Sequence, residues 1–208
     1  MNEQRKISGY VLAGGASSRF GKDKALAELQ GKSMLARTVD LVSVACEHVA
    51  VVAASNKLVN TAVETILDRW PGEGPLGGIL TALLDAKGIS SQNAWSLIVS
   101  CDMPFLTVEW LSFLIERAMQ SGAEVVVPRS SHGWEPLCAC WRTSAAEILT
   151  PLFEAGTRKV MEALNALHVE VLDEKDWKRF DTNGRLFWNM NTVADYEEAR
   201  RVIAAEKM

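Results

Sequence analysis

Short apolar runs alternate with segments of helical periodicity through the first 125 residues of the chain. The runs at 7–12, 48–54 and 95–100 are largely apolar, which is typical of strands buried on both faces. Between them lie segments with helical spacing; after Thr107, the i, i+3, i+4, i+7 stripe consists of Leu111, Leu114, Ile115 and Ala118. The alternation predicts an α/β protein of three layers, α/β/α, around a mostly parallel, doubly wound, Rossmann-like sheet.

Capping residues and shorter runs extend this prediction to the rest of the chain. Ser33 and Thr107 are expected to cap helices, and Thr192 with Asp195 predicts a capped C-terminal helix. The region from 128 to 190 breaks the regular alternation. The remaining predicted elements are strands at 65–67, 125–127 (ended by Pro128), 137–141 and 168–172, and helices at about 143–154 and 157–164.

Composition limits the classes of partner. The formal net charge is −4 and charged residues make up 23% of the chain, so no global basic field would recruit nucleic acid. No apolar run approaches the length of a membrane span, and the N-terminus, MNEQRKIS, does not resemble a signal peptide. The cysteines form no Cys-x-x-Cys pair and are expected to be reduced core residues. We therefore expect a cytoplasmic protein that binds neither nucleic acid nor membrane.

A glycine-rich, basic loop follows the first predicted strand. Residues 12–26 read LAGGASSRFGKDKAL. Glycines allow backbone N–H groups to approach an anion closely, and Arg19, Lys22 and Lys24 add positive charge. The spacing fits neither a Walker A loop nor the dinucleotide pattern GxGxxG, since Lys22 is followed by Asp23. The stretch favours a phosphate-binding loop over a surface loop with incidental cations.

Two aspartates also follow predicted strands, at the edge where doubly wound sheets bind their ligands. Asp102 lies in SCDMPFL, residues 100–106. Alone it could be a turn former or helix cap, but beside a phosphate loop it is a candidate ligand for Mg²⁺, which prefers hard oxygen atoms. Asp68 precedes a Pro-Gly turn and could simply be solvated.

Three further segments have both a functional and a purely structural interpretation. Glycines 74, 77 and 78 surround Pro75 at a helix start, which suits contact with a flat ligand or an ordinary tight turn. Asn189 and Asn191 share one face of an extended segment and could bind phosphate, metal or acceptor, or precede a helix cap. The basic segment at 156–164 could contact an anionic acceptor or be a solvated helix face.

In this order, the motifs resemble those of the molybdenum cofactor guanylyltransferases, within the nucleotidyltransferase superfamily. They are LAGGASSRFGKDKAL, GPLGGI, CDMPFL, EPLCACW, GTRKVMEAL and NMNTVADYEEA. The resemblance covers nearly the whole chain, and the ordered set is more specific than any single motif. It implies one domain with a nucleotide-binding half (1–127), an acceptor-side region (128–191) and a C-terminal helix (192–208).

The resemblance also implies residue roles. Arg19, Lys24 and Asp102 would be catalytic, with the two cations neutralising a triphosphate and Asp102 holding Mg²⁺. Asn189 and Asn191 would lie near the acceptor phosphate. The nucleotide would contact Leu12, Ala13, Gly14, Gly15, Gly21, Lys24, Asn56, Asp68, Gly74, Gly78 and Asp102. The sequence departs from the family pattern at Phe20, where Met is common, at Ala54, where Asn is sometimes found, and at Glu135, where His is often found.

The implied reaction is transfer of GMP from GTP to molybdopterin, with release of pyrophosphate. Proteins that deliver the cofactor and molybdoenzymes that accept it are further possible partners. Three alternatives stay open: a cytidylyltransferase for the same cofactor, a sugar-phosphate nucleotidyltransferase, and a non-catalytic accessory that binds the cofactor. The Asp23-Lys24 pair and the NMNT segment favour the guanylyl type.

Overall fold

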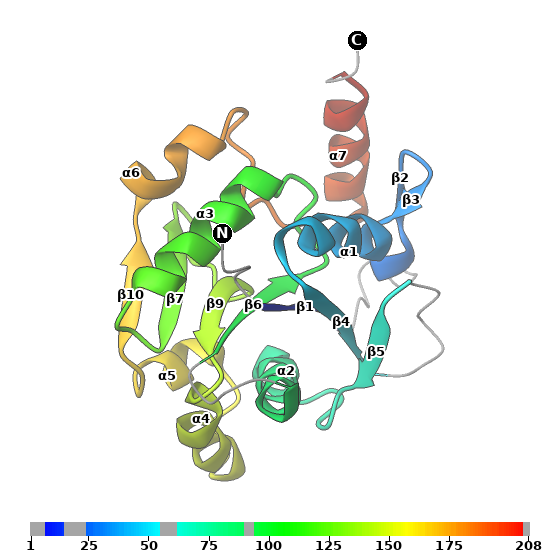
Figure 1. The fold of residues 1–208 in the computed structure, drawn as a ribbon. Coiled ribbons are helices and arrows are strands. Elements are labelled where there is room, and N and C mark those ends of the chain that lie inside the picture. The colour runs from blue at the N-terminus through cyan, green and yellow to red at the C-terminus, as the bar shows by residue number, and fades with distance from the viewer. Residues whose placement is uncertain (1–6, 15–23, 55–61, 90–93, 206–208) are drawn as a thin grey trace.

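The computed structural model describes residues 7–14, 24–54, 62–89 and 94–205 (Figure 1). Its main sheet has the strand order β10-β7-β9-β6-β1-β4-β5, with β8 paired to β7. The strands are β1 (Ser8–Ala13), β4 (His48–Ala53), β5 (Glu64–Leu67), β6 (Trp95–Ser100), β7 (Val125–Ser130), β8 (Gly133–Trp134), β9 (Cys138–Arg142) and β10 (Val169–Leu172).

The sheet is mostly parallel, which confirms the predicted α/β class. The central strand β1 runs parallel to β4 and β6, and β4 runs parallel to β5. β9 lies antiparallel between β6 and β7, whereas β7 and β10 are parallel. Leu12 stands beside Ser100 in the register, so the carboxyl ends of β1 and β6 meet at one edge.

Helices cover both faces of the sheet, so the predicted three layers are present (Figure 1). One face packs against α1 (Met34–Ala45) and α3 (Val108–Gln120), through a cluster that includes Val11, Val51 and Val99. The other packs against α2 (Pro75–Ile89), α4 (Ala145–Glu154) and α5 (Val160–Leu164). Tyr10 and Leu12, on either side of Val11 in β1, belong to this second cluster, because successive side chains of a strand point to opposite faces.

Predicted helix caps are present in the structure. The side-chain oxygen of Ser33 accepts from Ala36 N at 3.2 Å, and that of Thr107 accepts from Trp110 N at 3.2 Å. Thr192 and Asp195 form reciprocal bonds of 3.1 and 2.7 Å at the start of α7 (Val193–Ala205). Each bond satisfies a backbone donor that the helix itself leaves without a partner.

One predicted strand end was wrong. Pro128 does not end the strand that begins at Val125, since β7 continues to Ser130. The ladder to β9 stops at Val126, and pairing with β8 starts only at Arg129. No partner residue therefore faces Pro128 on that edge of β7. On the other edge Pro128 pairs with Leu172 at the last position of the β10 ladder, so the missing N–H falls where the pairing ends.

A small hairpin and several short elements were not predicted. β2 (Glu28–Leu29) and β3 (Lys32–Ser33) form a separate two-stranded sheet, which follows the 3₁₀ turn η1 (Lys24–Leu26). α7 packs against this hairpin, and Tyr196 Oη donates to Glu28 O at 2.9 Å. The other unpredicted elements are β8, α6 (Glu174–Trp177) and the 3₁₀ turn η3 (Lys178–Phe180).

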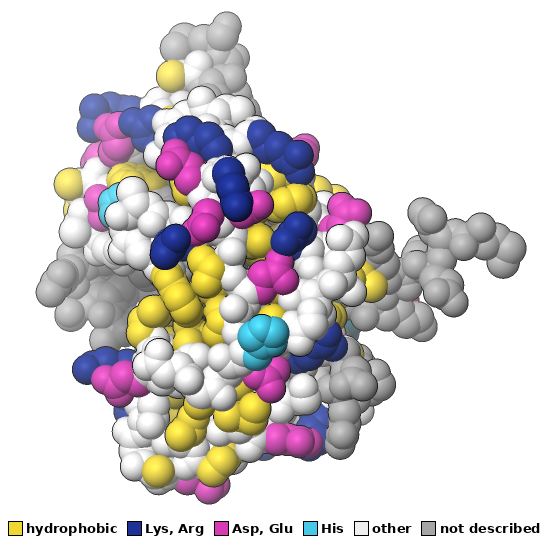
Figure 2. Space-filling model, turned by 90° about the vertical axis from the view of Figure 1, so that its left-hand side faces the viewer, with side chains coloured by type: hydrophobic (Ala, Val, Ile, Leu, Met, Phe, Trp, Pro, Cys, Tyr) yellow, Lys and Arg dark blue, Asp and Glu magenta, His cyan; other side chains and the backbone are white. Residues whose placement is uncertain are grey.

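The cysteines are buried and free, as predicted. Burial raises the pKa of Cys46 and of Cys138 to about 12, so both thiols stay protonated at neutral pH. Trp95, Trp110 and Trp141 are core residues. Within the described ranges, no helix is both long enough and apolar enough to cross a membrane. Figure 2 shows Lys and Arg side chains interspersed with Asp and Glu on one face of the molecule.

Candidate active site

The site is built at the carboxyl edge of the central strands. Cys101 N donates to Leu12 O at 3.3 Å, so the segment after β6 lies directly beside the end of β1. Leu12 and Ala13 are buried in β1, and Gly14 after them is exposed. Since β1, β4 and β6 are parallel neighbours, the loops that follow them leave the sheet at the same edge.

Part of the predicted phosphate loop lies outside the described residues. Gly15, Arg19, Gly21 and Asn56 belong to that part, and so does the side chain of Lys24. The described ends of the loop are Gly14 and the 3₁₀ turn at Lys24–Leu26. Phosphate binding by this loop stays a prediction.

Asp102 lies at the end of β6 and is almost completely buried, with 9% of its surface exposed. Its backbone carbonyl accepts from Met190 N at 2.8 Å. This bond places the NMNT segment, 87 positions or more further along the chain, directly on the loop that carries Asp102. The predicted metal carboxylate and the predicted acceptor segment are thus neighbours.

The two asparagines of that segment differ in their surroundings. Asn189 is half-buried, and its Nδ2 donates to Phe187 O at 3.2 Å. Asn191 is exposed, and its backbone N donates to Asp195 Oδ2 at 2.8 Å, which makes it part of the helix-capping arrangement. Asn189 lines a pocket, described below.

The glycine-rich turn joins β5 to α2 and brings α2 against β1. Gly74 has a positive φ of 89°, which favours glycine, and its carbonyl accepts from Gly77 N at 3.2 Å. A Cβ on Gly78 would lie 3.5 Å from Leu12 Cδ1, an ordinary contact distance. Two predicted nucleotide-binding positions, Leu12 and Gly78, therefore lie side by side.

Asp68 holds the turn itself together. Its Oδ1 accepts from Trp70 N at 3.0 Å and from Thr81 Oγ1 at 3.1 Å, and so connects the end of β5 to α2. This is a structural role that the sequence did not indicate. Contact between Asp68 and a nucleotide stays a prediction.

A pocket of about 380 Å³, which we call the acceptor pocket, lies next to Asp102. It is formed by the start of α2, the residue after Asp102, the turn before β9, the start of α5 and Asn189. Its lining residues are Pro75, Met103, Glu135, Pro136, Leu137, Lys159, Val160, Met161 and Asn189. Motifs that are far apart in the sequence, CDMPFL, EPLCACW, GTRKVMEAL and NMNT, thus meet around one cavity.

The two cations of the basic segment before α5 make different contacts. Arg158 forms an ion pair with Glu73 at 2.5 Å and stacks over the Phe153 ring at 3.9 Å, so it fastens the glycine-rich turn to α4. Lys159 lines the acceptor pocket, and its largely exposed amine lies 3.0 Å from Glu162 Oε1. Lys159 is the cation of this segment that can meet an anionic ligand.

Glu135 is a site residue that sequence reasoning noted only as a departure from a family pattern. It is 8% exposed, and Ser130 Oγ donates to its Oε1 at 2.6 Å. Burial raises the pKa of the Glu135 carboxyl; Ser130 and His132 oppose that shift, and the charge of Asp102 adds to it. A buried acid in a turn, rather than in an element with clear periodicity, has no reliable signature in a single sequence.

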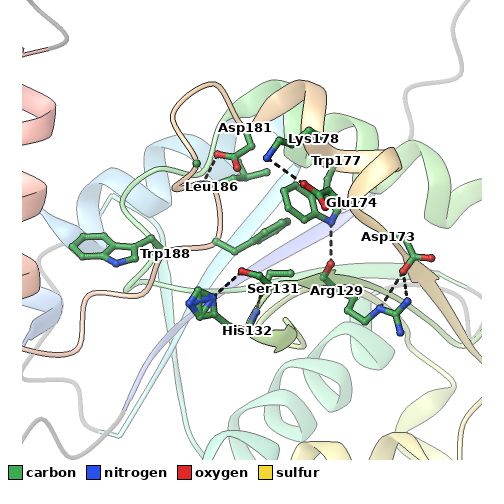
Figure 3. A pocket seen from close by; sticks show the side chains of 13 residues that line it. Arg129, Ser131, His132, Asp173, Glu174, Trp177, Lys178, Asp181, Leu186 and Trp188 are labelled. Atoms are coloured by element: carbon green, nitrogen blue, oxygen red, sulfur yellow. Dashed lines mark hydrogen bonds and ion pairs between the residues drawn. The ribbon is translucent and has the colours of Figure 1, made fainter.

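A second, larger cavity of about 520 Å³ adjoins the acceptor pocket, and we call it the aromatic pocket (Figure 3). Ser130, which bonds Glu135, lines it, as does Trp188, the neighbour of Asn189. Figure 3 shows its walls coming from the β7–β8 turn, from α6 and from the segment that carries Leu186 and Trp188.

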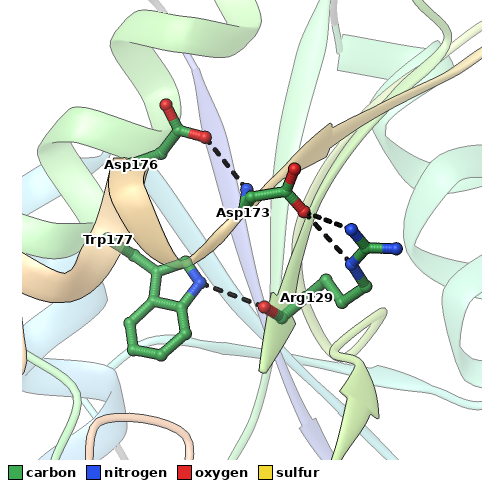
Figure 4. A network of polar contacts seen from close by, with 4 residues as sticks. All are labelled: Arg129, Asp173, Asp176 and Trp177. Carbon is green, nitrogen blue, oxygen red and sulfur yellow. Dashed lines mark hydrogen bonds and ion pairs between the residues drawn. The ribbon is translucent and has the colours of Figure 1, made fainter. Parts of the chain in front are cut away.

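A polar network fixes the wall of the aromatic pocket (Figure 4). Arg129 donates to Asp173 Oδ1 through Nε and Nη2, at 3.1 and 2.7 Å. Trp177 Nε1 donates to Arg129 O at 3.1 Å, and Asp173 N donates to Asp176 Oδ2 at 2.9 Å. The network therefore ties α6 to β7.

The fold and this edge together define an α/β protein of the nucleotidyltransferase class. A family model described as the MobA-like NTP transferase domain matches residues 9–170. The chain belongs to this family, which confirms the resemblance found in the motifs.

Individual relatives agree with the family. The chain is 31% identical over 205 residues to a protein named molybdenum cofactor guanylyltransferase from Desulfosudis oleivorans, covering 97% of this chain and 98% of that one. A Bacillus cereus protein named probable molybdenum cofactor guanylyltransferase is 30% identical over 207 residues, covering 97% and 99%. The crystal structure of molybdopterin-guanine dinucleotide biosynthesis protein A from Archaeoglobus fulgidus superimposes with a TM-score of 0.82 at 26% identity, covering 97% of this chain and all of that one.

Proposed function

We propose that the protein transfers GMP from GTP to the terminal phosphate of molybdopterin and releases pyrophosphate. The observation that carries this proposal is the meeting of Asp102, the Asn189 segment and the acceptor pocket at the carboxyl edge of β6. The names of the relatives support the choice of substrates. The cytoplasm is the proposed location, since the buried, free cysteines suit a reducing compartment.

The reaction requires alignment more than activation. An oxygen of the acceptor phosphate forms a bond to the α-phosphorus of GTP, and the bond from that phosphorus to the bridging oxygen breaks. Pyrophosphate leaves with the electron pair. Because the acceptor oxygen is already an anion, no Ser, Cys or His has to be deprotonated, and the protein contributes positioning and charge neutralisation.

The candidate site residues divide this work between them. Asn189 and Lys159 line the acceptor pocket and would hold the incoming phosphate beside Asp102. In our proposal, Arg19 and Lys24 neutralise the triphosphate, and Leu12 and Gly78 form the floor under the nucleotide. The acceptor and donor phosphates would then meet next to the end of β6.

The carboxylate of Asp102 is suited to hold Mg²⁺. A buried carboxylate beside an amide-bearing segment supplies the hard oxygen atoms that Mg²⁺ prefers, and Mg²⁺ takes few protein carboxylates when phosphates complete its shell. A bound Mg²⁺ would supply charge stabilisation on the phosphate oxygens. Asp102 would hold that ion close to the acceptor pocket.

A nucleotide and acceptor screen, measured by pyrophosphate release, tests the proposal. We expect release with GTP, molybdopterin and Mg²⁺ together, and little release when CTP replaces GTP or when sugar 1-phosphates replace molybdopterin. Faster release with CTP would identify a cytidylyltransferase. No release with any acceptor would point to a cofactor-binding accessory, and partner proteins for delivery or acceptance of the cofactor would then become the main question.

A further inference from the structure

Glu135 occupies an unusual position for an acidic residue. Among the residues that the structure describes, Asp102 and Glu135 are the acids with less than a tenth of their surface exposed. The two side chains are close enough for the charge of Asp102 to raise the pKa of the Glu135 carboxyl. The proposed metal site accounts for Asp102, but nothing in the proposed reaction accounts for Glu135.

The protein satisfies Glu135 only in part. A carboxylate has about four lone-pair positions for hydrogen-bond donors. In the described part of the chain, Ser130 Oγ is the hydrogen-bond donor to this carboxyl, at 2.6 Å. Lys159 lines the same pocket, but its amine is paired with Glu162 and largely exposed. A bound molecule with N–H donors would supply the missing partners.

The rest of the acceptor pocket suits a flat, mainly apolar ring. Pro136, Leu137, Val160 and Met161 contribute apolar surface, as in most pockets for small ligands, where a few polar groups fix the orientation. A carboxylate pairs best with two parallel N–H donors on a planar group. The aminopyrimidinone edge of a pterin presents such a pair, the 2-amino group and the adjacent ring N–H.

We infer that Glu135 is the residue that selects the acceptor, by accepting two hydrogen bonds from the aminopyrimidinone edge of its pterin ring. Ser130 is a positioning residue that holds the carboxylate in place. The inference rests on the proposed function, because it concerns the acceptor of that reaction. It assigns this edge to the pterin, although guanine carries the same pair of donors, since Glu135 shares its pocket with Lys159 and Asn189 and not with the described residues of the β1 loop.

Competing ligands test the inference directly. The probes are 6-carboxypterin and 6-carboxylumazine. In the lumazine, an oxygen replaces the 2-amino group of the pterin. Binding to the intact protein is measured by titration calorimetry, and steady-state transfer gives KM for molybdopterin and for GTP. Wild-type protein should bind the pterin at least about tenfold more tightly than the lumazine, because a lost charge-assisted hydrogen bond costs that much affinity.

The Glu135→Gln variant should bind the two probes with affinities within about threefold of each other. Its KM for molybdopterin should rise about tenfold or more, while its KM for GTP stays unchanged. Ser130→Ala should shift the KM for molybdopterin in the same direction by a smaller factor. An intact Glu135→Gln variant with unchanged discrimination and unchanged KM for molybdopterin would overturn the inference, and so would a rise in KM for GTP alone.

Failure of the inference and failure of the proposed function give different results. If wild-type protein transfers no GMP to molybdopterin, the proposed function fails, whatever the variants do. If wild-type protein is active and Glu135→Gln behaves identically, the function stands and only the role of Glu135 is lost. Thermal unfolding of each variant confirms that it is folded before the comparison is made.

Discussion

Two buried carboxylates distinguish the residues at the sheet edge from the rest of the described surface and core. Burying a charged group is costly, and the carboxyl groups of Asp102 and Glu135 are both buried next to a cavity. Each can therefore be tested by an isosteric amide, which removes the charge and keeps the shape.

Asp102→Asn should separate catalysis from folding. We expect the rate of pyrophosphate release to fall by about two orders of magnitude or more, since one preorganised electrostatic contact is typically worth that much. The free energy of unfolding should change far less than the rate, because the amide keeps the shape of the carboxylate. Pyrophosphate release and chemical denaturation of the same preparation measure both quantities. Near-normal release would remove Asp102 from the catalytic group.

Glu135→Gln should stabilise the protein at neutral pH. Burial, the largest cause, raises the pKa of this carboxyl in the folded state above its unfolded value. The protonated form therefore favours folding, and wild-type stability is lost as the pH rises through that raised pKa. The amide has no charge to bury, so the melting temperature of the variant should exceed that of wild type at pH 7–8, and the gap should close near pH 4. A variant that is less stable at both pH values would show that the carboxylate is structural.

The sequence indicated Asp102 but not Glu135, for a physical reason. Asp102 follows a continuous apolar strand, so its place at the sheet edge could be inferred from strand geometry alone. The burial of Glu135 depends on α5, the Met103 loop and Asn189 closing around one turn, which is a tertiary event. Asp68 shows the converse, since its bonds to Trp70 and Thr81 depend on where α2 starts.

At the scale of elements, helices pack closely against both faces of the central strand β1. α1 approaches one face of it at Gly9, where an added Cβ would lie only 2.3 Å from Val42 Cγ1. α2 approaches the other face through Gly78, where an added Cβ would lie 3.5 Å from Leu12 Cδ1. The two glycines therefore differ in how much extra volume each interface can accept.

The variants Gly9→Ala and Gly78→Ala form a matched pair. Gly9→Ala should lower the free energy of unfolding by about 1–3 kcal/mol, because overpacking forces the α1 contact apart. Gly78→Ala should leave stability unchanged or raise it by up to ~1 kcal/mol, since alanine favours helix. If Gly78 also lies against the nucleotide, its variant should lose GTP affinity while remaining fully folded. Urea denaturation and GTP titration measure these effects; equal destabilisation by both changes would contradict the packing argument.

Elements marked by an apolar run, by helical spacing or by a capping residue were predicted, and the shortest elements were not. The boundaries of β6 and the caps of α1 and α3 follow from continuous apolar runs and from side-chain oxygens before a helix. The hairpin β2–β3 has strands of two residues each, too short for any alternation to appear. An apolar run also gives no direction, so nothing in the sequence indicated that β9 would be antiparallel.

At the scale of the whole molecule, a third, smaller core connects the C-terminal helix to the site. It joins the β2–β3 hairpin and α7 around Leu29, Phe105, Met190 and Ile203. Met190 is fully buried there, and its backbone N donates to Asp102 O at 2.8 Å. The strand order and this cluster depend on long-range contacts, so the sequence could place α7 along the chain but not against the hairpin.

This third core should control the site through Met190. Met190→Ala and Ile203→Ala each remove a buried side chain from the same cluster, and each should cost about 2–5 kcal/mol of unfolding free energy, less where the neighbours can collapse. Only Met190 lies between Asn189 and Asn191 and bonds to the Asp102 loop, so only its variant should shift those groups. We expect Met190→Ala to raise KM for molybdopterin and lower turnover at a temperature where both variants are folded, with GTP binding retained.

Ile203→Ala is the control for stability loss alone and should keep wild-type kinetics per folded molecule. Equal kinetic losses in the two variants would show that the cluster acts through global stability and not through the position of the NMNT segment.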